Sequence, residues 1–255
     1  MYKNFANTVF IGKTVDYLPT CHSTNSVAAT LVKENKALNG QIVITDEQTH
    51  GKGQVGRSWE ASPGKNLTFS IVIFHERFRV KDQFDLNMVF SLGIFDFLSQ
   101  TVKTKVEIKW PNDVFCDGKK MCGILIANTV LSGNITDSVV GIGLNINQKS
   151  FNNAPGATSM KMLTGREYEV RTIFEGLVPC IERRYLAYME HGIQAVKFHY
   201  IDNLYRRGEK HFFERVENGN IFEGEIIGVA PTGKLSVNVG NRMEYYDFNT
   251  IRFVE

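Results

Sequence analysis

The sequence Lys109-Trp110-Pro111-Asn112-Asp113 places a cation, a large aromatic ring, a rigid turn residue, an amide and a carboxylate in five consecutive positions. The alternating run 106–110 predicts a strand that ends at the proline, which has no N–H for a sheet ladder. Asn112 and Asp113 then follow the strand end, where open sheets present ligand-binding groups. An amide can bind phosphate or a ribose-type hydroxyl, and a carboxylate can hold Mg²⁺. We interpret Trp110 and Pro111 as scaffold and leave Lys109 open.

The next segment predicts a β-hairpin. Residues 114–116 and 119–126 flank Asp117-Gly118, a strong two-residue turn signal. Lys119 and Lys120 follow this turn, and strand alternation places them on opposite faces. One of them must face the interior, where a buried ammonium needs an anion. We expect Lys119 to be solvated and Lys120 to be the working cation.

Upstream lies a glycine-rich basic loop, Gly51-Lys52-Gly53-Gln54-Val55-Gly56-Arg57-Ser58-Trp59, within the long polar segment 46–66. Glycines let backbone N–H groups approach an anion, and Lys52 and Arg57 add charge. Trp59 can cover an adenine or another ring. We expect a loop that becomes ordered over a phosphorylated ligand. Its GxGxxG spacing is not a dinucleotide fingerprint, because the glycines follow the polar run 46–50 and the next predicted element is a strand, so no βαβ unit is available.

The remaining pattern predicts an α+β fold with two parts. Strands are expected at 10–18, 41–45, 67–74, 106–110 and 138–145, and helices begin near His22–Asn25 and cover 82–102 and 170–189. After about Arg207 only short strands and tight turns remain, which is typical of a small β-barrel-like module of SH3 size. We therefore expect a main domain over 1–206 and an SH3-like domain over 207–255.

Composition excludes several classes of function. The 255 residues carry a net charge of only +2, which gives no support for nucleic-acid binding. The four cysteines form no CxxC pair and predict reduced thiols in a cytoplasmic protein rather than a metal cage. No signal peptide and no run of membrane-spanning length is apparent, so no membrane partner is expected. Few residues precede the first predicted helix, so we expect no N-terminal DNA-binding domain.

Several motifs, in order along nearly the whole chain, resemble those of biotin–protein ligases, also called biotin–[acetyl-CoA-carboxylase] ligases. Each motif is weak alone, and the combination is specific. The matching stretches are Ser23-Thr24-Asn25, Glu47-Gln48-Thr49, the glycine-rich loop, Pro63-Gly64-Lys65-Asn66-Leu67, Lys109–Asp113, Lys120-Met121-Cys122-Gly123-Ile124-Leu125 and Gly141-Ile142-Gly143-Leu144-Asn145. The short N-terminus resembles the monofunctional type.

The resemblance implies a class II synthetase-like catalytic domain with a mixed, largely antiparallel sheet and helices on one face. It implies ATP and biotin as substrates with Mg²⁺, a biotinyl-5′-AMP intermediate, and transfer of biotin to a lysine of a biotin carboxyl carrier domain. The catalytic residues implied are Lys120, Lys52 and Arg57. The biotin site implied contains Ser23, Thr24, Asn25, Gln48, Gly51, Gly53, Gly123 and Lys120. The nucleotide site implied contains Lys52, Gln54, Arg57, Trp59, Asn112, Asp113, Asn145 and Arg252, with Asp113 also as a metal ligand.

One position departs from the family pattern. Many members carry an arginine where this chain has Gln54, and that arginine contacts phosphate. Glutamine donates hydrogen bonds but carries no charge, so we expect weaker retention of the adenylate unless Lys52 or Arg57 compensates.

Two rival functions remain: a lipoate–protein ligase, which has a similar fold, and a non-enzymatic biotin sensor or transcriptional repressor. The glycine-rich loop with Trp59 and the Lys109–Asp113 stretch favour biotin. A homodimer through strand 138–145 or its neighbours is left open.

Overall fold

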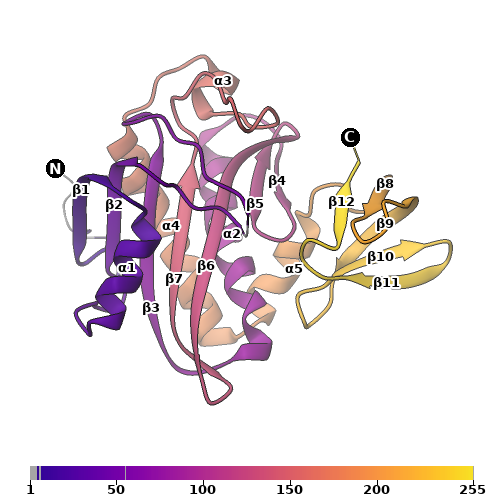
Figure 1. Cartoon of the computed structure of the whole chain (residues 1–255), viewed down its shortest axis with the longest axis horizontal. Helices are drawn as coiled ribbons and strands as arrows, with labels where there is room; N and C mark the ends of the chain where they lie inside the picture. Colours follow the sequence, from indigo (N-terminus) through magenta and orange to yellow (C-terminus); the bar gives the residue numbers. More distant parts are fainter. Residues whose placement is uncertain (1–4, 6, 55, 255) are drawn as a thin grey trace.

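The computed structural model describes residues 5, 7–54 and 56–254, and its main element is a seven-stranded mixed sheet (Figure 1). The strand order is β1-β2-β3-β7-β6-β5-β4. Only β1 and β2 pair in parallel, so the predicted mixed, largely antiparallel sheet is confirmed. The strands are β1 Val15–Cys21, β2 Ile42–Gln48, β3 Leu67–Arg79, β4 Val106–Lys109, β5 Asp113–Cys116, β6 Lys119–Leu131 and β7 Asn134–Leu144.

Helices cover both faces of this sheet. The long helices α2 (Phe84–Thr101) and α4 (Val170–His191) pack together, and their apolar side chains share one core with Ile44, Ile71 and Ile142 of the sheet. Helix α1 (Thr24–Lys33) packs on the opposite face, where Ala28 meets Val43, Val72 and Val139. The expectation of helices on one face is therefore wrong for α1. The short helices are η1 Val80–Asp82, α3 Met160–Thr164 and α5 Gln194–Asp202.

One predicted strand boundary and the possible dimer through strand 138–145 need correction. The first strand begins at Val15, not Phe10, because Gly12 has a positive φ of 76° and residues 9–11 donate their backbone N–H groups to the Glu182 carboxylate of α4. Strand β7 lies between β3 and β6 in the interior of the sheet. Its backbone groups are already paired on both sides, so it cannot form an edge-to-edge dimer.

A second, five-stranded antiparallel sheet follows at the C-terminus, as predicted for a small β module (Figure 1). Its order is β11-β10-β9-β8-β12, so the last strand pairs with the first of the module. The strands are β8 Lys210–Arg215, β9 Ile221–Val229, β10 Leu235–Val239, β11 Arg242–Tyr246 and β12 Ile251–Phe253.

The module docks against the end of β4. The indole Nε1 of buried Trp110 donates to the carbonyl of Gly233 at 2.9 Å, and its ring lies 5.2 Å from that of Phe248, centroid to centroid. The interpretation of Trp110 as scaffold is thus correct, and its Trp110–Pro111 peptide bond is cis. Within the described chain, no helix combines the length and apolarity needed to cross a membrane.

Candidate active site

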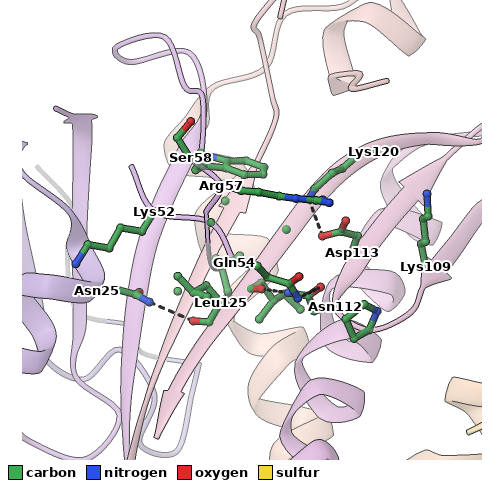
Figure 2. A pocket seen from close by; sticks show the side chains of 18 of the residues that line it. Asn25, Lys52, Gln54, Arg57, Ser58, Lys109, Asn112, Asp113, Lys120 and Leu125 are labelled. Carbon is green, nitrogen blue, oxygen red and sulfur yellow. Dashed lines mark hydrogen bonds and ion pairs between the residues drawn. The ribbon is translucent and has the colours of Figure 1, made fainter. Parts of the chain in front are cut away.

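A cavity of about 680 Å³ opens on the α1 face of the main sheet, in the area that α1 leaves uncovered. Figure 2 shows its side chains converging from the glycine-rich loop, the β4–β5 turn and strand β6. Of the predicted site residues, fourteen line it: Ser23, Thr24, Asn25, Gln48, Lys52, Gly53, Gln54, Arg57, Trp59, Asn112, Asp113, Lys120, Gly123 and Arg252. Gly51 and Asn145 are outside this lining.

The floor of the cavity is made of glycines. Gly123 of β6 pairs with Gly143 of β7, and Gly141 lies two residues before Gly143 on the same face. A Cβ at Gly143 would overlap the Trp59 indole, and one at Gly141 would overlap the Asn25 side chain. A Cβ at Gly123 would lie 3.0 Å from the Trp59 ring. The absent side chains therefore let Trp59 and Asn25 lie directly on the sheet, and the Gly-Ile-Gly pattern within a strand is the sequence signal for such a close approach.

The predicted biotin-binding residues form one hydrogen-bonded group at the start of α1. The Gln48 side-chain oxygen accepts from the Thr24 backbone N–H at 2.8 Å. Asn25 donates to the Leu125 carbonyl at 3.2 Å and accepts from Ser70 at 2.5 Å. Ser23 occupies the predicted N-cap position, although its side chain makes no capping bond. These contacts fix neutral donors and acceptors at one end of the cavity, which suits an uncharged polar ring.

The charged group lies further along the floor. The Lys120 Nζ is 2.7 Å from an Asp113 carboxylate oxygen and 5.7 Å from the Trp59 ring centroid. The Lys120 side chain is 32% exposed and Asp113 is 22% exposed, so water screens this pair only in part. Lys119 is exposed, which confirms the predicted alternation. Figure 2 shows Arg57 reaching across the cavity toward this pair.

The glycine-rich loop folds back on itself over the cavity. An antiparallel bridge joins Lys52 and Ser58, and the Trp59 N–H donates to the Gly51 carbonyl at 2.9 Å. The Lys52 ammonium donates to Ser26 of α1 at 2.9 Å, so it points away from Lys120 (Figure 2). The Gln54 amide donates to the Asn112 side-chain oxygen at 3.1 Å. Val55 lies outside the described residues.

Two predicted nucleotide-binding amides are engaged within the protein. Asn112 is buried, donates to the Ile124 carbonyl and accepts from Gln54. Asn145 donates to the Thr158 carbonyl at 3.0 Å, while its buried side-chain oxygen has no partner among the described residues. Asn112 thus joins the loop to the floor, and Asn145 joins the end of β7 to the β7–α3 connection.

The C-terminal module completes the cavity wall. Arg252 was predicted, but its neighbours Val216, Asn249, Ile251 and Phe253 were not. The Lys109 ammonium, also in the lining, lies 4.7 Å from the Phe253 ring centroid and 4.8 Å from that of Phe115. These residues reach the cavity because the module docks there, and no local sequence motif predicts a contact between the module and the cavity.

The thiols near the site are not reactive groups. Burial raises the pKa of Cys116 to about 12, and it raises the pKa of Cys122 further, so both remain protonated at neutral pH. Within the described residues no group of three or more His, Cys, Asp or Glu side chains could hold a metal ion. Asp113 is the single carboxylate in the described lining. This donor set fits a Mg²⁺ ion held mainly by substrate phosphates.

The sequence matches a known protein family. Residues 17–145 match the Biotin/lipoate A/B protein ligase family. This chain is a member of that family. It is similar to the bifunctional ligase/repressor BirA of Bacillus subtilis, with 27% identity over 233 residues, 89% of this chain and 70% of BirA. It is also similar to the biotin–[acetyl-CoA-carboxylase] ligase of Paracoccus denitrificans, with 28% identity over 211 residues, 79% of this chain and 87% of that one.

The fold of this family member also matches solved structures. The biotin protein ligase of Aquifex aeolicus in complex with biotin and ATP aligns with a TM-score of 0.78 and 22% identity, over 95% of this chain and 100% of that one. The family match includes the glycine-rich loop, the Lys120–Asp113 pair and the glycine floor, whereas the module residues of the cavity lie beyond it.

Proposed function

We propose that this chain is a biotin–protein ligase, which uses ATP to attach biotin to a lysine of a biotin carboxyl carrier domain through biotinyl-5′-AMP. The observation that carries the proposal is the Lys120–Asp113 pair on a glycine floor, beneath a basic loop, in a family of biotin and lipoate ligases. Relatives named as biotin ligases favour biotin over lipoate.

The first step joins two anions and therefore needs cations. The biotin carboxylate oxygen attacks the α-phosphorus of ATP, the bond to the bridging oxygen breaks, and pyrophosphate leaves. Lys120 stabilises the negative charge on the carboxylate and the α-phosphate, and Asp113 holds its ammonium in place. Because both groups are partly buried, this interaction is stronger than in water.

In the second step the carrier lysine attacks the acyl carbon of the mixed anhydride, an amide bond forms, and AMP leaves with the electrons of the broken C–O bond. The glycine-rich loop must keep water away until then. We assign Arg57, Gln54 and Trp59 to enclosing the adenylate and Lys52 to holding the loop on α1. Ser23, Thr24, Asn25 and Gln48 are assigned to the ring end of biotin, and Arg252 to the ATP phosphates.

Mg²⁺ is part of the proposal. Asp113 would contribute one ligand, and the ion would neutralise phosphate charge when ATP binds.

We also propose the domain division at 206/207, because the second sheet begins at Lys210 and a separate set of strands forms it. The cytoplasm is the proposed location, since the described thiols are free, as expected in a reducing compartment.

Exchange of labelled pyrophosphate into ATP tests the function. Exchange should require biotin, and lipoate should not replace it. A chain that binds biotin but exchanges nothing would be a sensor, and lipoate-dependent exchange would identify a lipoate ligase.

Lys120→Ala should lower the exchange rate by about 100- to 1000-fold, because one preorganised electrostatic contact is worth that much in comparable sites. Lys119→Ala is the matched control, since it removes an exposed neighbouring ammonium from the same strand and should leave exchange unchanged. Near wild-type exchange by Lys120→Ala would refute the assignment of Lys120.

A further inference from the structure

Glu60 connects two loops that are far apart in the sequence. It directly follows Trp59, the last residue of the glycine-rich loop. One carboxylate oxygen accepts from the Asn152 backbone N–H at 2.9 Å and the other from the Asn153 backbone N–H at 2.7 Å. Both acceptors belong to one charged carboxylate, and hydrogen bonds to a charged group are among the stronger ones in a protein. In the described part of the chain Glu60 forms no ion pair, and its carboxylate is engaged by this loop.

Asn152 and Asn153 belong to the β7–α3 connection, residues 145–159. One end of this connection is fixed by buried Gln148, whose side-chain oxygen accepts from Ser62 at 2.8 Å and Asn66 at 2.5 Å. Glu60 holds the exposed middle. The connection is therefore anchored to the segment that follows the glycine-rich loop at two separate places.

The far end of the same connection holds Lys120. The Lys120 backbone N–H donates to the Gly156 carbonyl at 2.9 Å, and the Thr158 N–H donates to the Lys120 carbonyl at 2.9 Å. This is a parallel bridge at the residue whose ammonium faces Asp113 and Trp59. The β7–α3 connection is thus bonded at one point to the Glu60 side chain, which follows the glycine-rich loop, and at another to the backbone of Lys120.

We propose that Glu60 is a positioning residue that clamps the glycine-rich loop to the β7–α3 connection and keeps the cavity closed over the adenylate. The inference rests on the proposed function. Without the clamp, the loop and the Lys120 strand move independently, so the cavity opens more often. The groups at the start of α1 do not depend on Glu60, so binding of biotin alone is unaffected.

The test compares Glu60→Ala and Glu60→Gln with Glu217→Gln, an exposed control in a turn of the C-terminal module. Trypsin reports on both loops, because Lys52 and Arg57 lie in the glycine-rich loop and Lys149 lies in the connection. Glu60→Ala should raise cleavage at all three sites several-fold. Release of preformed biotinyl-AMP should accelerate about tenfold, while the Kd for biotin changes less than twofold. Glu60→Gln retains one acceptor oxygen and should be intermediate.

Two results would overturn the proposal. Faster cleavage with unchanged release of the adenylate would make Glu60 a loop-stabilising residue without a role in retention. Faster cleavage in one loop alone would show that the loops are not coupled. If the wild-type protein formed no biotinyl-AMP, the proposed function would fail, whereas the protease pattern would still decide whether the clamp exists.

Discussion

At the scale of single residues, Gln54 places a neutral amide where the cavity would hold phosphate. Its side chain donates to Asn112, which in turn donates to the Ile124 carbonyl, so the loop is joined to the floor through neutral groups. A hydrogen bond in which one partner is charged is worth about 1.5–3 kcal/mol, which is more than a bond between two neutral groups contributes. Gln54 therefore joins the loop to the floor, and we expect it to hold an anion weakly.

Gln54→Arg should slow dissociation of biotinyl-AMP by about tenfold, since 1.4 kcal/mol of added interaction corresponds to that factor. The rate is measured by release from the preloaded protein after dilution. Gln83→Arg, the same change at an exposed position outside the cavity lining, is the control. Unchanged retention in Gln54→Arg would show that Lys52 or Arg57 already supplies the missing charge.

Single residues were predictable where a local rule constrains them. Alternation after the Asp117-Gly118 turn identified Lys120 as the inward-facing cation, and the position of its partly buried ammonium next to Asp113 follows from its need for an anion. The use of Asn112 as an internal link was not predictable, because its partner Gln54 is 58 positions away along the chain. Glu60 also lacks any motif, since its partners are backbone groups.

At the scale of elements, three strands are joined by a partly buried polar row. Ser138 of β7 donates to the Asn128 side-chain oxygen of β6 at 2.7 Å, so its hydroxyl oxygen accepts from His75 Nε2–H of β3 at 2.8 Å. The imidazole also stacks on Phe78. Burial lowers the pKa of His75 to about 4, although the nearby Asp137 carboxylate opposes the shift. The folded state thus holds this histidine neutral.

This pKa predicts a loss of stability in mild acid. His75 takes up a proton near pH 6.5 in the unfolded chain but only near pH 4 in the folded protein. Its contribution to the free energy of unfolding is therefore fully present above pH 6.5 and is lost as the pH falls from 6.5 to about 4. Between pH 7 and pH 5 the loss from this residue should be about 2 kcal/mol. Urea unfolding at the two pH values measures it.

His75→Gln keeps a donor for Ser138 and should show about 2 kcal/mol less pH dependence than the wild type. His191→Gln, at an exposed position, should retain the full dependence. Equal pH dependence in all three proteins would show that His75 does not titrate differently on folding.

Elements with a strong period were predicted with nearly correct bounds, as α2 and α4 illustrate. The errors came from tertiary contacts. Strands β6 and β7 extend to Leu131 and from Asn134, because each supplies the hydrogen-bonding edge that prolongs the other. The placement of α1 on the opposite face was not predictable, since both faces of the central strands are apolar.

At the scale of the whole molecule, the cavity is assembled from two sheets. Trp110 fixes the C-terminal module to the main sheet through Gly233, and Lys109 lies among aromatic rings that include Phe253 of the module. All five residues of the Lys109–Asp113 stretch line the cavity, and the first two also contact the module. Sequence patterns indicated both sheets, but the contact between them arises only when the chain folds.

The positions of the two tryptophans also give the protein a built-in optical signal. Trp110 is buried with its indole N–H bonded, whereas the Trp59 indole rests on the glycine floor with a buried N–H that has no partner among the described residues. A ligand on that floor must move the Trp59 ring or bond to it, so the fluorescence emission should shift on adding biotin and ATP. The response should vanish in Trp59→Phe and persist in Trp110→Phe. Emission that follows Trp110 instead would mean that ligand binding moves the C-terminal module, and that the glycine floor is not where the ring of the substrate lies.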